Sequence, residues 1–202
     1  VDAMIRPNYA VKSIVKITLF TLLPIGYSLF DRQVSFRKLF SFNKGSIKVS
    51  FFLGVVVYIF ILGAYFILGP YFDFSKVTLA LQNNIGVNKN NFVFVAIYIS
   101  FINSLLEEFF FRGISFLNLK DVLGRRAAYL FSAAIFAFYH IAIMTSWFSP
   151  ILFMILIISL FVAGLMFDWL DEKNGNIYVS WMVHMSANLA INTIGFILFG
   201  IL

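Results

Sequence analysis

The chain has 202 residues, of which 61% are hydrophobic and 12% are charged, and its net charge is +6. A soluble domain is about 45–50% apolar and about 25% charged, so this composition excludes an ordinary soluble domain and indicates a polytopic membrane protein. The absence of cysteine excludes a disulfide framework and a thiolate zinc site. The basic residues lie between apolar runs and form no separate basic domain, so nucleic acid is not an expected partner.

Apolar segments follow one another along the whole chain, and each is about as long as the 17–25 residues that cross a bilayer core of about 30 Å. Their approximate ranges are 13–30, 50–69, 92–117, 127–146, 150–169 and 177–201. Because a backbone in hydrocarbon must satisfy its own hydrogen bonds, each segment is expected to be a helix. The sequence therefore predicts an all-α, polytopic transmembrane helix bundle of about six spans, which forms a single membrane-embedded domain over residues 1–202.

The connections between these segments predict the orientation of the chain. Those at about 31–49, 118–126 and 170–176 carry Arg32, Arg37, Lys38 and most of the other loop charges, so the positive-inside rule places them in the cytoplasm. Three basic residues would then lie on the outer side and argue weakly against this orientation: Arg6, Lys12 and Lys16. Three acidic residues are interpreted as a solvated cytoplasmic helix end: Asp168, Asp171 and Glu172.

The third segment contains the stretch NSLLEEFFFRGISF, in which Glu107, Glu108 and Arg112 lie among apolar side chains. If the helix ended before Glu107, residues 92–106 alone would be too short to cross a bilayer. The span is therefore expected to continue through both glutamates and to hold them inside the membrane. A charge at the middle of a bilayer costs roughly 2.5–3.5 kcal/mol on insertion scales, so these residues are candidates for function.

Helical spacing separates the three charges of this segment into two groups. Glu108 and Arg112 are four residues apart with the glutamate first, which is the favoured order for an ion pair on a helix. At about 100° per residue, Glu107 lies roughly 140° around the helix from Arg112, on a polar stripe with Asn103. We therefore expect Glu108 and Arg112 to form a structural ion pair. Glu107 is expected to stay outside this pair and to be the catalytic carboxylate. A buried neutral acid bonded to Asn103 is the alternative.

Both histidines of the chain, His140 and His184, also fall well within predicted spans, and Asn188 follows His184 by about one turn. At about 1.5 Å per residue from the proposed cytoplasmic helix ends, Glu107 lies about 15 Å deep, His140 about 20 Å, His184 about 10 Å and Asn188 about 16 Å. Three helices thus bring four polar side chains to one level, which is what a site in a bundle core needs. For each histidine alone, a hydrogen-bonded core residue is the ordinary alternative.

Three motifs occur in order along the second half of the chain. EEFFFR at 107–112 fits the pattern EExxxR, FAFYH at 136–140 fits FxxxH, and HMSAN at 184–188 fits HxxxN. With these motifs the chain resembles the CPBP family, which includes type II CAAX prenyl endopeptidases and the Abi proteins of bacteriocin processing or immunity. The resemblance covers a core of about residues 95–195, and no motif position departs from the pattern.

The resemblance implies an intramembrane glutamate-type endopeptidase that cleaves peptide or protein substrates, with or without a lipid group. Glu107 and His140 would activate the attacking water, while His184 and Asn188 would form the oxyanion hole. The chemistry of these groups agrees, since a buried carboxylate can act as a general base and amide or imidazole N–H groups can donate to an oxyanion. Supporting roles would belong to Glu108, Arg112, Phe136 and Asn103, with Phe136 as a ring wall beside the site.

The resemblance implies no cofactor, but it leaves open a zinc-dependent form of the protease. Two histidines and a carboxylate can bind zinc with an open position, and the ligands would be Glu107, His140 and His184. A non-proteolytic bacteriocin-immunity or regulatory membrane protein is a further alternative. A small transporter would need inverted repeats or broken helices, and neither is evident. The expected location is the bacterial plasma membrane, with membrane lipids around the chain and a site that is accessible from the cytoplasm.

Overall fold

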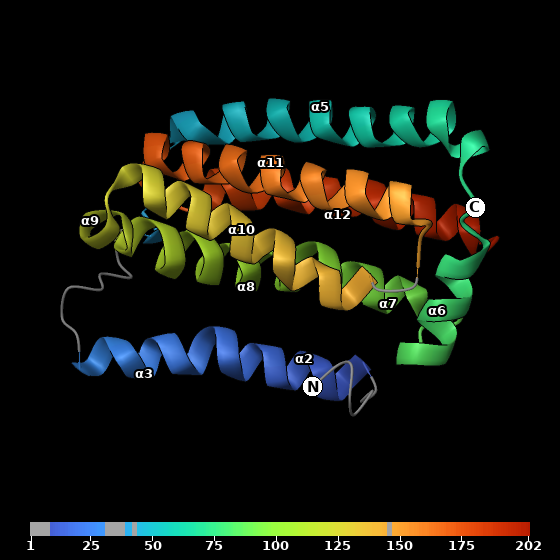
Figure 1. The fold of residues 1–202 in the computed structure, drawn as a ribbon, viewed down its shortest axis with the longest axis horizontal. Helices are drawn as coiled ribbons and strands as arrows, with labels where there is room; N and C mark the ends of the chain where they lie inside the picture. Colours follow the sequence, from blue (N-terminus) through green and yellow to red (C-terminus); the bar gives the residue numbers. More distant parts are fainter. Residues whose placement is uncertain (1–8, 31–38, 42–43, 145–146) are drawn as a thin grey trace.

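The computed structural model of the chain describes residues 9–30, 39–41, 44–144 and 147–202. Every regular element in these ranges is a helix, which confirms the predicted all-α fold (Figure 1). Four basic residues that the predicted orientation took into account lie outside the described ranges: Arg6, Arg32, Arg37 and Lys38.

The first half of the chain forms an N-terminal helix with a π-helical segment in its middle, then a long single helix, then a short one. In chain order the elements are α2 (Tyr9–Ile17), η1 (Thr18–Leu22), α3 (Leu23–Phe30), α5 (Lys44–Leu68), η2 (Gly69–Tyr71) and α6 (Ser75–Ile85). Here η1 is a π-helical segment that joins α2 to α3 without interruption, and η2 is a single 3₁₀ turn. The N-terminal helix therefore runs continuously from Tyr9 to Phe30.

The second half of the chain contains the segments that carry the three motifs. In chain order its elements are α7 (Phe92–Ile97), η3 (Tyr98–Asn103), α8 (Ser104–Glu107), η4 (Glu108–Asn118), α9 (Lys120–Leu123), α10 (Arg125–Met144), α11 (Pro150–Asn174) and α12 (Tyr178–Leu198). Both η3 and η4 are π-helical, so the expected third span alternates between α and π winding. Ser149 accepts a hydrogen bond from the backbone of Leu152 and caps the start of α11.

Five helices among the described residues have the length and composition of a membrane span. They are Val11–Leu29, Gly45–Tyr71, Phe92–Leu123, Pro150–Asn174 and Tyr178–Leu198. The third span continues through both glutamates, as the sequence predicts. The expected segment 127–146 forms the helix α10. The chain is a multi-pass membrane protein.

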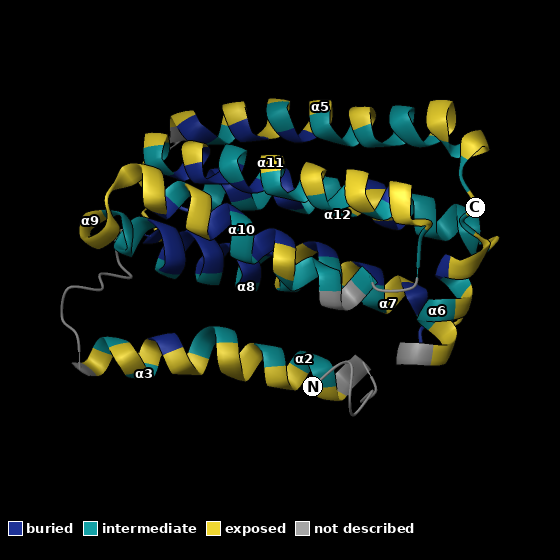
Figure 2. Cartoon of the chain, viewed as in Figure 1, coloured by how far each residue is buried: buried dark blue, intermediate teal, exposed yellow. Residues whose placement is uncertain are grey.

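The helices lie side by side, with the motif-bearing ones in the interior (Figure 1). Helix α5 packs along α12, and α10 packs against α11 and η4. Buried residues gather on the inner helices, whereas α2, α3 and α5 expose much of their surface (Figure 2). A core between the inner helices consists of Phe111, Phe136, Phe167, Leu170, Val179 and Val183. The exposed apolar side chains of α5 and the N-terminal helix are suited to contact lipid.

Small residues allow α10 and α11 to approach closely. A Cβ atom added to Gly164 would lie 2.9 Å from Ala133 Cα and 3.0 Å from Ala133 Cβ. At these distances α10 and α11 would have to move apart. We expect Gly164→Ala to destabilise the protein by about 1–3 kcal/mol, the usual cost of overpacking. Gly63→Ala in α5 is the matched control, because nothing lies within 4 Å of its added Cβ. Thermal unfolding in detergent compares the two variants, and equal stability would contradict the tight contact.

Candidate active site

Glu107 lies at the centre of a buried polar cluster that three helices build. It is the last residue of α8, its side chain is 2% exposed, and its Oε2 faces both histidines. The distance from Oε2 is 3.8 Å to His140 Nε2 on α10 and 3.6 Å to His184 Nε2 on α12. Within the described part of the chain, this Oε2 has no direct hydrogen-bond partner. The three side chains that the sequence places at one depth therefore converge on one carboxylate oxygen.

The winding of the third span changes from α to π immediately after Glu107. A turn of about 100° per residue describes an α-helix and does not hold beyond Glu108. The ion pair between Glu108 Oε1 and Arg112 Nη1 nevertheless forms, at 3.3 Å. π-Helical turns are rare and occur frequently at functional sites. Here the change of winding lies between the two adjacent glutamates of the motif.

Glu108 has a second contact that helical spacing could not reveal. Its Oε1 lies 2.7 Å from His184 Nδ1, so both glutamates approach the same imidazole ring from opposite nitrogens. An ionised carboxylate can only accept, so the Nδ1–H of His184 donates to Glu108. Such a carboxylate fixes the orientation and the tautomer of the ring. Glu108 therefore both pairs with Arg112 and orients His184.

Arg112 is fully buried and lies between two acidic side chains. Its Nε lies 3.6 Å from Asp168 Oδ1, and its guanidinium carbon lies 4.0 Å above the ring of Phe136. The hydroxyl of Ser132 donates to Asp168 Oδ1 at 2.9 Å. The interpretation of Asp168 and Asp171 as solvated residues is therefore wrong, since both are completely buried. A signal was present in the sequence, because Asp168 falls inside the predicted fifth span.

His140 is held by the backbone of its own helix. Its Nδ1 lies 2.8 Å from the carbonyl oxygen of Phe136, which can only accept a hydrogen bond. In the neutral ring Nδ1 therefore carries the proton, and the lone pair of Nε2 faces Glu107. The ring of Phe136 contacts both imidazoles, with centroids 4.7 Å from His140 and 5.8 Å from His184. Phe136 thus lies between the two histidines.

Asn188 is on the same helix as His184 but makes a different contact. Its amide donates to the carbonyl of Ile99 at 3.2 Å, and Asn192 donates to the carbonyl of Ala96 at 3.2 Å. These contacts attach the polar face of α12 to the neighbouring span. The structure therefore does not bring Asn188 into contact with Glu107. Its amide has a second N–H group, so the oxyanion role stays a prediction.

Lys16 reaches Glu107 from the N-terminal helix. Its Nζ lies 2.5 Å from Glu107 Oε1 and 2.5 Å from Asn103 Oδ1, while Asn103 Nδ2 donates to the same Glu107 oxygen at 2.9 Å. The side chain of Lys16 is 12% exposed. Its side chain therefore lies inside the bundle and not in water beside the membrane, while its place on the outer side stays a prediction. The sequence signal was a single lysine inside an otherwise apolar predicted span.

No group of three or more histidine, cysteine, aspartate or glutamate side chains in the described ranges has an arrangement that could hold a metal ion. The donors that the zinc alternative named are nevertheless close together, with both histidine Nε2 atoms within 3.8 Å of Glu107 Oε2. The other oxygen of Glu107 already contacts the ammonium of Lys16. A second cation on this carboxylate would experience repulsion from that ammonium.

Comparison with known proteins identifies the second half of the chain. Searches of curated proteins and of solved structures found no match. A family model with the description "Type II CAAX prenyl endopeptidase Rce1-like" matches residues 89–190, just over half of the chain. This range contains Glu107, His140, His184 and Asn188. The chain therefore belongs to the Rce1-like family of type II CAAX prenyl endopeptidases.

Proposed function

We propose that the protein is an intramembrane endopeptidase that hydrolyses peptide bonds with a water molecule activated by Glu107 and His140. The observation that carries this proposal is the convergence of both histidine Nε2 atoms on Glu107 Oε2, at 3.8 and 3.6 Å, in a buried core. Membership of a protease family supports the same reaction class. No serine or cysteine nucleophile is needed, because the attacking group is water.

The first step of the proposed reaction is attack by water. A gap of 3.8 Å between Glu107 Oε2 and His140 Nε2 is short enough for one water to hydrogen-bond to both at about 2.8 Å. Glu107 takes a proton from this water while the water oxygen bonds to the peptide carbonyl carbon. The electron pair of the carbonyl double bond moves to its oxygen, which becomes an oxyanion. His140 accepts a hydrogen bond from the water through its Nε2 and orients it.

The second step breaks the peptide bond. The proton that Glu107 received passes to the leaving nitrogen, the C–N bond breaks, and the products are a carboxylic acid and an amine. Glu108 accepts the Nδ1–H of His184 and fixes the ring, and an N–H at its Nε2 would donate to the oxyanion. The second N–H group of Asn188 would be a further donor.

The proposed substrate is a peptide or protein whose scissile bond enters the bundle between the spans, from the cytoplasmic side. A lipid group on the substrate is compatible with a site that lies among membrane helices. The experiment compares envelope peptides, by mass spectrometry, in bacterial cells that make either the intact protein or Glu107→Gln. Fragments that appear only with the intact protein would support the proposal. Identical peptides, with a biological effect that both proteins exert, would instead favour the non-proteolytic immunity alternative.

Metal removal tests the chemistry of the proposed site. We expect cleavage by the purified protein to be unchanged after treatment with a chelator, because Glu107 and His140 activate water without a metal ion. Elemental analysis of the purified protein is expected to give less than stoichiometric zinc. The zinc-dependent alternative would be supported by stoichiometric zinc together with activity that chelation removes and zinc restores.

A further inference from the structure

The contact between Lys16 and Glu107 joins the proposed site to a part of the chain outside the matched family range of 89–190. We propose that Lys16 is a positioning residue for Glu107, so that the N-terminal span completes the active site. This inference rests on the proposed function, because it assigns a role relative to the same carboxylate. It adds one residue, on a different helix, to the machinery that the three motifs define.

The geometry divides the two oxygens of Glu107 between two tasks. Oε1 receives hydrogen bonds from Lys16 Nζ at 2.5 Å and from Asn103 Nδ2 at 2.9 Å. Oε2 makes no such bond within the described ranges and faces the two histidine Nε2 atoms. Two donors on one oxygen fix the rotation of the carboxylate group, which leaves the other oxygen directed at the water site. Positioning of this kind is a substantial part of catalysis in a preorganised site.

Charge leads to the same assignment. A carboxylate buried away from water requires a compensating partner. Arg112 is the other buried cation near the cluster, but its contacts are with Glu108 and Asp168. Lys16 is the cation that the structure places on Glu107. The ammonium balances the negative charge that Glu107 needs as a general base, in a buried place where an unpaired charge is costly.

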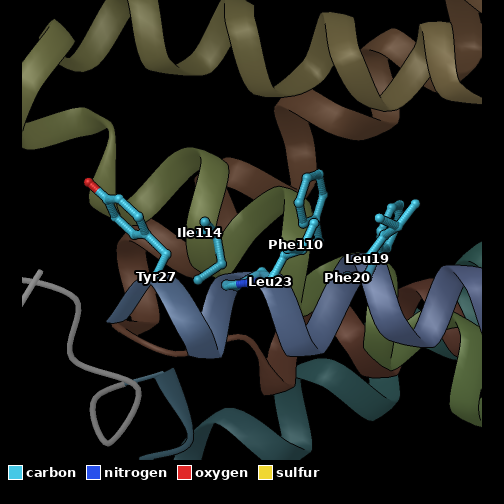
Figure 3. Close-up of a pocket in the computed structure, with 7 residues that line it drawn as sticks. Leu19, Phe20, Leu23, Tyr27, Phe110 and Ile114 are labelled. Carbon is cyan, nitrogen blue, oxygen red and sulfur yellow. The ribbon is translucent and has the colours of Figure 1, made fainter. Parts of the chain in front are cut away.

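Aromatic packing holds the N-terminal helix in the position that this contact requires. Phe20, one turn after Lys16, stacks on Phe110 of η4 with ring centroids 4.4 Å apart. The ring of Tyr139 lies 4.7 Å from Lys16 Nζ, on the side of α10. Phe20 also lines an apolar groove of about 440 Å³, whose lining residues Figure 3 shows between the N-terminal helix and η4. Lys16 therefore reaches Glu107 beside the point where the helix is attached.

The test compares three variants in a cleavage assay with a quenched-fluorescence peptide that the intact protein cleaves and Glu107→Gln does not. Lys16→Met keeps the length of the side chain but removes its charge, and we expect kcat to fall at least tenfold with KM nearly unchanged. Lys16→Arg keeps the charge and is expected to recover part of that rate. Lys12→Met removes the same charge one turn earlier on the same helix, and it is expected to retain the original rate.

Chemical rescue separates the need for a cation from the need for packing. In Lys16→Ala, added propylammonium is expected to restore cleavage several-fold, whereas propanol is expected to have no effect. Because the chain has no cysteine, a cysteine pair at the groove residues Leu23 and Ile114 can report whether the N-terminal helix is still attached, through its yield with a bifunctional maleimide. The expected yield in Lys16→Met is that of the unaltered chain.

The outcomes distinguish the inference from the function on which it rests. Full activity of Lys16→Met, together with an inactive Glu107→Gln, would overturn the role of Lys16 and leave the proposed function standing. Loss of the maleimide cross-link in Lys16→Met, without rescue of Lys16→Ala by propylammonium, would also overturn it, because Lys16 would then serve packing alone. Cleavage by Glu107→Gln at the original rate would overturn the proposed function itself.

Discussion

Glutamine in place of Glu107 is expected to lower the rate of peptide cleavage at least about a hundredfold, and glutamine in place of His140 by a similar factor. Each change removes one of the two groups that contact the proposed water, since Glu107 Oε2 and His140 Nε2 are 3.8 Å apart. The double variant is expected to lose little more than either single one, because groups that act on one water molecule act as a unit.

The measurement is kcat for the unaltered protein, Glu107→Gln, His140→Gln and the double variant. All four are purified in detergent and assayed with the same peptide. Glu172→Gln is the control, because Glu172 is an acidic residue of the same bundle whose contacts are with Arg125 and Tyr129 near the ends of their helices. Its rate should remain near that of the unaltered protein. If the factors for Glu107 and His140 multiplied in the double variant, the two groups would act in separate steps, and the shared water would be wrong.

Much of the fold follows from segment length alone. The third span had to include Glu107 and Glu108, since the residues before them are too few to cross a bilayer, and the helix from Phe92 to Leu123 does so. The segment at 127–146 shows the limit of this argument. It forms the helix α10, but segment length does not reveal that this helix carries His140 and Ser132 towards its neighbours.

The contacts between the site residues were harder to predict from the sequence than the positions of the helices. Depth along each span brought Glu107, His140 and His184 to one level, because a moderate error in the rise per residue changes the depth little over so few residues. Direction around the helix could not be obtained in the same way, since it depends on π winding that begins at Glu108. The contact of Glu108 with His184 therefore had no counterpart in the sequence argument.

The contacts of Lys16 and Asp168 show a second reason why side-chain contacts could not be predicted from the sequence. Both residues lie near the ends of predicted spans, where a charge can either face water or turn inward. The choice depends on which partner the packing supplies: Glu107 for Lys16, and Arg112 for Asp168. A single sequence shows the charges but not which helices pack together. The partners of these two residues are therefore evident only in the structure.

Methionine in place of Arg112 is expected to destabilise the protein by about 3–5 kcal/mol, the usual cost of removing one partner from a buried ion pair. The side chain of Arg112 is fully buried and contacts Glu108 Oε1 at 3.3 Å and Asp168 Oδ1 at 3.6 Å. Its loss leaves two buried carboxylates without a compensating cation. Cleavage should fall as well, because Glu108 also orients His184. Thermal unfolding in detergent and kcat at a temperature where the variant is folded measure the two effects separately.

Arg125→Met is the control for this change, since Arg125 forms its ion pair with Glu172 at the surface, with 65% of its side chain exposed. It should leave the unfolding midpoint nearly unchanged, because solvent screens an exposed pair. Asp168→Leu combined with Arg112→Met should recover part of the lost stability, since it removes one of the uncompensated carboxylates. A double variant less stable than Arg112→Met alone would show that Asp168 stabilises the core through Ser132 and not through Arg112. In that case the stability of this core would depend on the hydrogen bonds of Asp168 more than on its charge.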